Sequence, residues 1–244
     1  MTQNNLGNAY AALPTGERGA NLGRAIECYQ QALAIEHLSP WERMRYLRNL
    51  GDAYRELEDH PSAIAAYRQA IDLDPDDPWL FNTLGNAYSG QEQHEPALEA
   101  YTTALTLVTA DEDKALLYRN RANTLIQLSR LDEAGQDCEQ AHVLAPDHPY
   151  THDRLGDLAF ARGDYSAAIE HYDAALDRQP EAGFYFDRGL AYLALGHLDQ
   201  ALTDYQAAVP LATAVTVAEA LKELDKFATD HPDTPGLDAV RALM

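Results

Sequence analysis

The sequence predicts an all-α solenoid of stacked helical hairpins that ends in capping helices. A six-residue motif recurs along the chain, as NLGNAY (5–10), NLGDAY (49–54), TLGNAY (83–88), NRANTL (120–125), RLGDLA (154–159) and DRGLAY (187–192). The small residues within it follow one another at spacings of 44, 34, 37, 34 and 33 residues, at Gly7, Gly51, Gly85, Ala122, Gly156 and Gly189. A sustained period of about 34 residues is typical of helical solenoids.

A second signature follows the first in repeats two to six. It places an alanine twelve residues after the small residue, then an aromatic residue or cysteine, then another alanine, as in Ala63, Tyr67 and Ala70. The first repeat carries extra residues around PTGERGAN (14–21), after which Ala25, Tyr29 and Ala32 restore the pattern. These fixed offsets predict two helices per repeat.

Apolar residues within each repeat recur every three or four positions, as Met44, Leu47, Leu50 and Tyr54 do. This spacing places them on one face of a helix. We therefore expect first helices at about 2–12, 41–57, 78–90, 115–128, 150–162 and 182–195, and second helices at about 21–36, 61–74, 95–108, 131–144, 165–178 and 198–211. The small residues lie where the two helices approach closely, so a bulkier side chain there should overpack.

The predicted units divide the chain into an array and a cap. The array of six units occupies 1–213, at about 1–40, 41–77, 78–114, 115–148, 149–181 and 182–213. Residues 214–244 keep helical spacing but lose the motif, which favours a degenerate capping helix pair. We expect the first helix to start near Met1 without an N-cap, which suggests a piece of a longer protein.

The two signatures resemble the tetratricopeptide repeat, whose pattern runs from Leu-Gly and Tyr to Ala, an aromatic residue, Ala and Pro. The resemblance covers about 1–213 and implies a right-handed superhelix whose first helices line a concave groove. Residues 2–33 are similar to bacterial arrays attached to CHAT peptidases or signalling NTPases. That similarity implies a regulatory arm and no catalytic residue here.

The composition excludes several classes of partner. The 244 residues carry 18 Lys and Arg against 39 Asp and Glu, a formal net charge of −21. This disfavours nucleic acid, because Lys and Arg supply most phosphate binding, and it disfavours a polybasic membrane anchor. The sequence also has no signal peptide or membrane-spanning apolar run, so we expect a cytoplasmic protein. Cys28 and Cys138 form neither a CxxC pair nor a disulfide framework.

No segment carries a recognised catalytic or cofactor motif, so we expect neither an enzyme nor a bound cofactor. The glycine-rich stretch 15–24 does not match a phosphate-binding loop, and DLDPDDP (72–78) lacks the glycine and the distal glutamate of a calcium loop. His148 and His152 lie four residues apart, but zinc needs further ligands. We therefore interpret this pair as accidental and predict no metal site.

Charge patterning indicates where a protein partner would bind. The predicted first helices sum to +3 and the second helices to −12. The groove implied by the resemblance would then be neutral to basic on an acidic body. An extended peptide that is acidic or ends in a free carboxylate fits such a groove best.

The candidate peptide-binding residues are those whose offset from the small residue places them in this groove. Asparagines both donate and accept, so a ladder of them can hold a peptide backbone, while arginines suit carboxylates. The candidates are Asn5, Asn8, Arg48, Asn49, Arg55, Asn82, Asn86, Arg119, Asn120, Asn123 and Arg154. Arg119 with Asn123 is similar to the basic-plus-Asn pairing of tetratricopeptide carboxylate clamps, but Asp52 replaces an asparagine of the full clamp.

Two alternatives stay open at this point. The candidate residues are equally interpreted as solvated polar side chains that bind nothing. The chain could also serve as a regulatory or scaffold arm that acts by domain packing or by self-association of its uncapped first helix through Leu6 and Tyr10. The aromatic run GFYFD (183–187) favours core of the sixth unit over an apolar anchor pocket.

Overall fold

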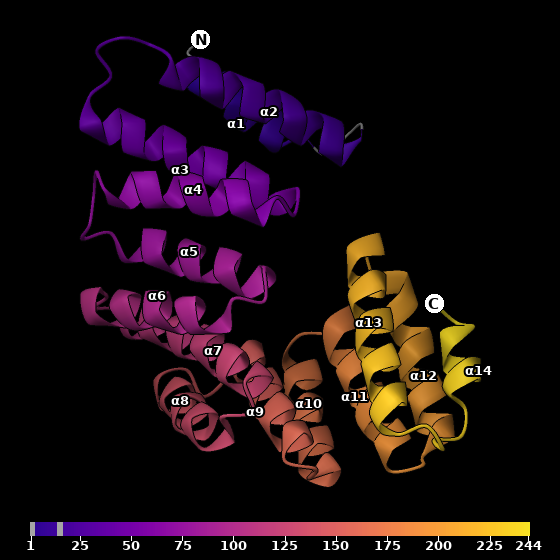
Figure 1. The fold of residues 1–244 in the computed structure, drawn as a ribbon. Coiled ribbons are helices and arrows are strands. Elements are labelled where there is room, and N and C mark those ends of the chain that lie inside the picture. The colour runs from indigo at the N-terminus through magenta and orange to yellow at the C-terminus, as the bar shows by residue number, and fades with distance from the viewer. Residues whose placement is uncertain (1–2, 14–16) are drawn as a thin grey trace. The chain divides into compact units, whose positions relative to one another are not determined.

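The computed structural model describes residues 3–13 and 17–244, and its regular structure there is entirely helical (Figure 1). Pro14, Thr15 and Gly16 of the predicted long first loop, and Met1 and Thr2 at the expected helix start, lie outside the described residues. Five pairs of consecutive helices pack as hairpins: α1 (Gln3–Ala11) with α2 (Arg18–Leu33), α3 (Pro40–Glu56) with α4 (His60–Ile71), α5 (Pro78–Gly90) with α6 (His94–Leu107), α9 (Pro149–Ala161) with α10 (Tyr165–Arg178), and α11 (Ala182–Ala194) with α12 (Leu198–Ala208). Between α6 and α9 the chain forms α7 (Asp111–Gln127) and α8 (Leu131–Leu144), the helices of the fourth repeat.

After α12 come a short 3-10 helix, η1 (Val209–Leu211), then α13 (Ala214–Asp230) and α14 (Leu237–Arg241). Leu224 and Phe227 of α13 and Val240 of α14 are buried in the same cluster as residues of α11 and α12. These two helices are the capping pair that the sequence predicts after residue 213.

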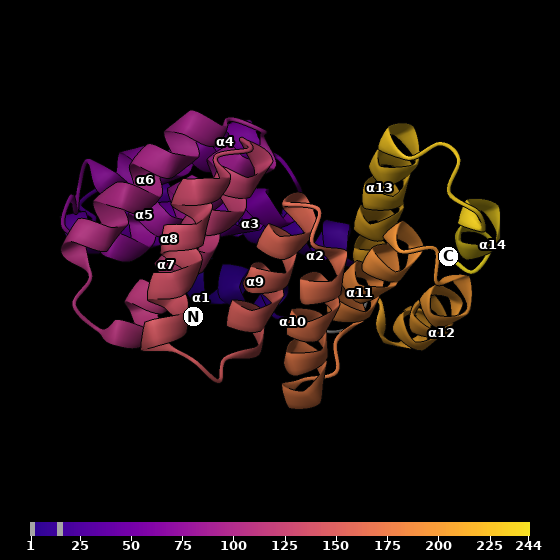
Figure 2. The same ribbon diagram turned by 90° about the horizontal axis from the view of Figure 1, so that it is seen from below.

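The chain forms two compact units, Met1–Thr124 and Leu125–Met244, with the division inside α7. Within the first unit, α3 packs on α4, α4 on α5 and α5 on α6; within the second, α9 packs on α10 and α10 on α11 (Figures 1 and 2). Because each hairpin leaves an apolar face uncovered, packing against the next hairpin completes its core.

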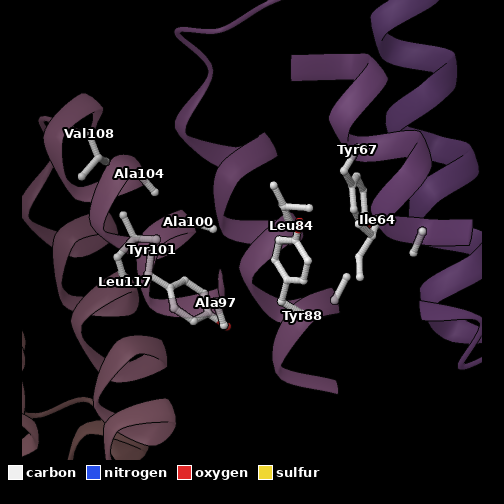
Figure 3. Close-up of a cluster of buried hydrophobic side chains, with 12 residues drawn as sticks. Ile64, Tyr67, Leu84, Tyr88, Ala97, Ala100, Tyr101, Ala104, Val108 and Leu117 are labelled. Atoms are coloured by element: carbon white, nitrogen blue, oxygen red, sulfur yellow. The ribbon is translucent and has the colours of Figure 1, made fainter. Parts of the chain in front are cut away.

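Five of the six repeats place a glycine of the first helix against a tyrosine ring of the second helix. A Cβ added to Gly7, Gly51, Gly85, Gly156 or Gly189 would lie 2.5, 2.6, 2.6, 2.5 or 2.7 Å from an atom of Tyr29, Tyr67, Tyr101, Tyr172 or Tyr205. Tyr67 and Tyr101 are almost completely buried among Ile64, Leu84 and Leu117 (Figure 3). In the fourth repeat Ala122 takes the place of the glycine and Cys138 the place of the tyrosine, and both side chains are buried.

Helix ends follow local chemistry. Ser39 caps α3 in a reciprocal capping box with Glu42, and Asp77 caps α5 by accepting from the Trp79 backbone N–H. α7 begins at Asp111, four residues before the range expected from the sequence. Three acidic residues, Asp111, Glu112 and Asp113, occupy its first turn, where they interact favourably with the helix dipole and extend the helix into the predicted loop.

No helix among the described residues is both long enough and apolar enough to cross a membrane.

Candidate functional site

The first helices of unit 1 form a shared polar surface, which we call the unit 1 face; it comprises α1, α3, α5 and α7 up to Thr124. Asn49 of α3 donates through Nδ2 to Oδ1 of both Asn4 and Asn8 of α1, each at 3.1 Å. In the same way, Asn120 of α7 donates through Nδ2 to Oδ1 of Asn82 of α5 at 2.9 Å. The structure thus brings the predicted asparagines together, and part of their hydrogen-bonding capacity is used between neighbouring helices.

In four repeats the residue directly after the small residue accepts a hydrogen bond from the tyrosine of the second helix. Tyr29 donates to Asn8 at 2.9 Å and Tyr101 to Asn86 at 2.8 Å. Asp takes the same place in two further repeats, where Tyr67 donates to Asp52 at 2.7 Å and Tyr172 to Asp157 at 2.8 Å. A carboxylate can only accept from a hydroxyl, so the tyrosine is the donor in those repeats. The sequence shows both partners, but their link appears only in the fold.

This contact changes the acidity of both groups in the second repeat. Burial, followed by the neighbouring Asp52 carboxylate, raises the pKa of the Tyr67 hydroxyl. Burial also raises the pKa of Asp52, while the Tyr67 hydrogen bond and the charges of Arg55 and Arg48 lower it. The two arginines therefore lie close enough to stabilise the charge of Asp52.

The cationic candidates of unit 1 differ in their exposure. The Arg48 side chain is 37% exposed. Its guanidinium lies 3.9 Å from the Asp77 carboxylate, so the two groups form a long ion pair. Arg55 is half-buried, and Arg119 is buried with 8% exposed. Asn5 is exposed and Asn123 half-buried. Arg48 and Arg55 are therefore both more accessible than Arg119.

The predicted self-pairing residues of α1 make contacts within unit 1. Tyr10 packs against the cluster formed by Leu22, Ala25 and Tyr29, and the Arg24 guanidinium lies 5.8 Å from its ring centroid. Pairing of α1 with another copy stays a prediction.

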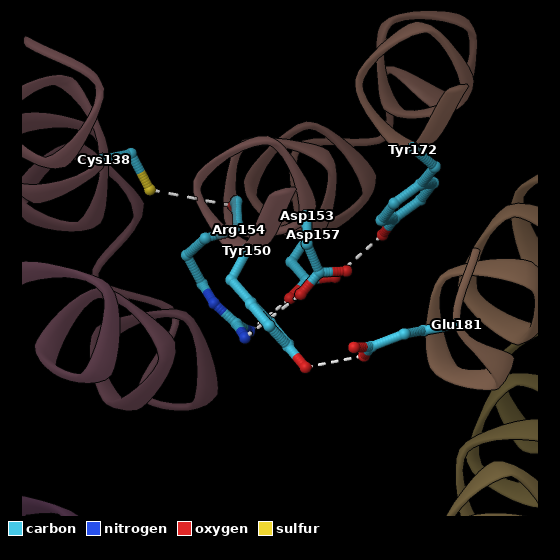
Figure 4. A network of polar contacts seen from close by, with 7 residues as sticks. All are labelled: Cys138, Tyr150, Asp153, Arg154, Asp157, Tyr172 and Glu181. Carbon is cyan, nitrogen blue, oxygen red and sulfur yellow. Dashed lines mark hydrogen bonds and ion pairs between the residues drawn. The ribbon is translucent and has the colours of Figure 1, made fainter. Parts of the chain in front are cut away.

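The unit 2 face, formed by α9 and α11, has a different electrostatic character (Figure 4). The Arg154 guanidinium pairs with Asp157 and lies 3.4 Å from Asp153. Tyr150 donates to Glu181 at 2.6 Å beside this network. As a receptor for a peptide carboxylate, Arg154 would have to exchange a partner that it already holds.

Three carboxylates of the unit 2 face converge. One oxygen each of Asp153, Asp157 and Asp187 lies within 4.8 Å of the others. Burial and the Asp157 charge raise the pKa of Asp153 to about 7, and burial with the Asp153 charge raises the pKa of Asp187 well above its ordinary value. This part of the first-helix surface therefore gathers three carboxyl groups around Arg154, a clustering that the whole-helix charge sums do not indicate.

A second buried ion pair in unit 2 was not predicted from the sequence. Arg188 of α11 binds both carboxylate oxygens of Asp204, at 2.8 and 2.6 Å, and also contacts Asp173. Asp204 is 3% exposed. Arg188 and Asp204 are 16 residues apart in the sequence, which is also the spacing between Gly51 and Tyr67, two residues in contact across a hairpin. This shared spacing is the sequence signal that could have linked Arg188 with Asp204. The predicted core position of GFYFD is confirmed, because Phe184 and Phe186 are buried.

Comparison with known proteins supports the same architecture. Models described as "TPR repeat" and "Tetratricopeptide repeat" match residues 51–92, 80–107, 113–181 and 154–215. A tetratricopeptide repeat protein from Parabacteroides merdae has a similar structure, with a TM-score of 0.69 at 17% identity over 99% of this chain and 95% of that chain. At this identity the likeness concerns the fold alone.

Two curated relatives show similar sequences. The Hsp70-Hsp90 organizing protein of Triticum aestivum is 24% identical over 188 residues, which are 77% of this chain and 32% of the relative. The DnaJ homolog subfamily C member 7 homolog of Dictyostelium discoideum is 28% identical over 118 residues, 48% of this chain and 22% of the relative. The chain thus spans about a third or less of these relatives. With its repeated hairpins, its glycine–tyrosine contacts and the four model matches, the chain belongs to the tetratricopeptide repeat family.

Proposed function

We propose that the chain is a non-catalytic protein-interaction module that binds an extended peptide on its first-helix surface, and that this peptide is acidic or ends in a free carboxylate. The observation that carries the proposal is the row of oriented amides on the unit 1 face. The wheat relative, named for organizing Hsp70 and Hsp90, supports an interaction role of this general kind. We also propose a cytoplasmic location.

The tyrosine contacts favour peptide-backbone recognition. Asn8 and Asn86 each use Oδ1 to accept from a tyrosine, so their NH₂ groups are the part available to donate. Such donors match the carbonyl oxygens of an extended peptide. Because the tyrosine already fixes each amide, binding orders fewer side chains and costs less conformational entropy.

The charge of α3 favours a carboxylate on that peptide. Arg48 and Arg55 flank the single carboxylate of Asp52, which leaves this stretch of the helix with a net positive charge. The ion pair of Arg48 with Asp77 is long and partly exposed, so it adds little to the stability of the fold. A peptide carboxylate can therefore replace Asp77 as the partner of Arg48 at low cost. The arginine part of the proposal therefore depends mainly on Arg48 and Arg55, with Arg119 and Arg154 as further candidates.

A fluorescence titration of the full chain with C-terminal peptides rich in Asp and Glu tests this proposal. We expect saturable binding that the double variant Arg48→Ala/Arg55→Ala weakens at least about tenfold, or about 1.4 kcal/mol. Arg68→Ala is the matched control, because Arg68 lies on the second helix α4, where it stacks over Tyr88. If the affinity for the peptide is the same at low and high salt and the same in the double variant as in the wild type, these arginines do not recognise its carboxylates. The similarity to arrays attached to CHAT peptidases or signalling NTPases stays a prediction.

A further inference from the structure

Three aspartates of the unit 2 face, which we call the carboxylate trio, bring their oxygens close together. Asp153 and Asp157 lie one helical turn apart on α9, and Asp187 lies on α11, the first helix of the next repeat. One oxygen of each lies within 4.8 Å of the other two. Figure 4 shows Asp153 and Asp157 side by side, between Arg154 and Tyr172. The fold therefore already holds the three carboxylates around one point.

Two members of the trio have oxygens that no donor satisfies. The Asp153 side chain is 8% exposed, and its Oδ1 is buried with no hydrogen-bond partner among the described residues. Its Oδ2 makes a long contact, at 3.4 Å, with the Arg154 guanidinium. Asp187 makes no hydrogen bond or ion pair with any other residue that the structure describes. A carboxylate removed from water without a partner costs free energy, which a bound cation would recover.

The charges around the trio favour a divalent cation. When ionised, its three carboxylates face one guanidinium, that of Arg154, which pairs with Asp157. Burial and repulsion within the trio raise the pKa of its other two members, and the negative charges of Glu181 and Glu223 add to this effect. The trio with Arg154 thus carries two uncompensated negative charges, and the two glutamates add further negative charge nearby. A divalent cation neutralises this excess, although Arg154 opposes it.

The spacing of the oxygens fits one ion without rearrangement. Ca²⁺ binds oxygens at about 2.3–2.6 Å, so two oxygens on opposite sides of one ion lie about 5 Å apart and neighbouring ones lie closer. The trio falls within that range. Its donors are all carboxylates, which select hard cations over Zn²⁺. We propose that Asp153, Asp157 and Asp187 form a binding site for one divalent cation of the class of Ca²⁺ and Mn²⁺.

The existing contacts of Asp157 are compatible with this role. Its Oδ1 accepts from the Tyr172 hydroxyl at 2.8 Å, and its Oδ2 accepts from Arg154. A carboxylate has about four lone-pair sites, so each oxygen can accept a second partner. The two contacts fix the carboxylate before an ion binds, so binding costs little side-chain entropy. Asp157 and Asp187 are partly exposed, which allows water to complete the coordination.

Calorimetric titration of the untagged, EDTA-treated full chain with CaCl₂, and separately with MnCl₂, tests the site at pH 7.5. About 0.1 M KCl screens the exposed carboxylates, which would otherwise attract cations weakly all over this acidic chain. We expect one ion per chain, and at least a tenfold loss of affinity in Asp187→Asn and in Asp153→Asn. Asp177→Asn is the matched control, because it removes the same charge from an exposed position on α10 and should bind normally.

A second measurement separates the trio from scattered surface carboxylates. Protons compete with the ion for the trio, so the affinity should be lower at pH 6 than at pH 8. Asp187→Asn has no hydrogen bond to lose among the described residues, and circular dichroism confirms that each variant is folded.

Two results would overturn the proposal. One is the absence of saturable binding of either ion below millimolar concentration in the wild-type chain. The other is unchanged affinity in folded Asp153→Asn and Asp187→Asn, which would place the ion elsewhere. The site does not depend on peptide binding to the unit 1 face, so both results leave the proposed function untouched.

Discussion

At five of the six repeats a glycine contacts the face or edge of a tyrosine ring. In the fourth repeat both positions differ, with Ala122 in place of the glycine and Cys138 in place of the tyrosine. The two positions are therefore coupled: a methyl group on one helix requires a smaller side chain on the other. Four of these tyrosines also orient the polar residue that follows the glycine. In those four repeats one residue pair links helix packing to the chemistry of the first-helix surface.

Gly51→Ala should destabilise the protein by about 1–3 kcal/mol, because the new Cβ would lie 2.6 Å from the Tyr67 ring. Urea unfolding measures the change. Gly23→Ala is the control, since nothing lies within 4 Å of its Cβ position and alanine favours a helix. Gly51→Ala combined with Tyr67→Cys should cost less than the sum of the single changes. Strict additivity would contradict the steric coupling.

The raised pKa of Asp153 makes stability depend on pH with a definite sign. An unfolded aspartate has a pKa of about 3.9, whereas burial and Asp157 raise the pKa of Asp153 to about 7. The folded state therefore binds more protons between these values, and this contribution is present below about pH 4 and lost as the pH rises through about 7. Asp153→Asn should accordingly gain thermal stability relative to the wild type from pH 5 to pH 8. A constant difference would show that Asp153 has an ordinary pKa.

At the scale of the element, the turn between the two helices of the second to sixth repeats uses a left-handed residue at the same place. Gly163 and Gly196 have φ of 79° and 77°, and the equivalent residues Glu58, Glu92 and Ser129 have φ of 60°, 58° and 56°. The left-handed region costs a residue with a Cβ about 1–2 kcal/mol. Three of the turns therefore carry backbone strain that glycine would avoid.

Gly163→Ala should destabilise the fold by about 1 kcal/mol, because only the backbone opposes it: nothing lies within 4 Å of the added Cβ. Glu92→Gly should stabilise by about 0.5–1 kcal/mol for the converse reason. Chemical denaturation of both variants provides the measurement. A loss of unfolding free energy in Gly163→Ala together with a gain in Glu92→Gly would support backbone strain in the turn. A change in the same direction in both variants would contradict it.

The helices were predictable because their signals are local. Proline at the start of α5, the alanines of the second signature and the 34-residue period give hairpin positions directly. The start of α7 was missed because its acidic first turn resembles a loop in composition. The cluster of Asp153, Asp157 and Asp187 was missed because whole-helix charge sums hide which side chains converge.

At the scale of the whole molecule, the main electrostatic feature is the formal net charge of −21. Like charges at this density repel one another and disfavour the compact state. Raising NaCl from low to physiological concentration should therefore raise the melting temperature, because salt screens exposed charges beyond about 8–10 Å. A melting temperature that falls with salt would mean that ion pairs such as Arg154 with Asp157 outweigh the repulsion.

The same charge shapes partner binding. An acidic peptide approaching this chain meets overall repulsion, so attraction must come from local groups, chiefly Arg48 and Arg55 on the unit 1 face. On the unit 2 face the Arg154 guanidinium is already paired with Asp157 and Asp153, so this face attracts a peptide carboxylate less than the unit 1 face does. We therefore expect the acidic end of the peptide on unit 1.

Hydrogen-exchange mass spectrometry of the full chain, with and without a saturating acidic C-terminal peptide, tests the central claim most directly. If the peptide binds on the unit 1 face, amide protection should rise in α1, α3 and α5 and stay unchanged in α2, α4 and α6. Protection confined to the second helices, or no change at a peptide concentration that saturates fluorescence, would contradict binding on this surface.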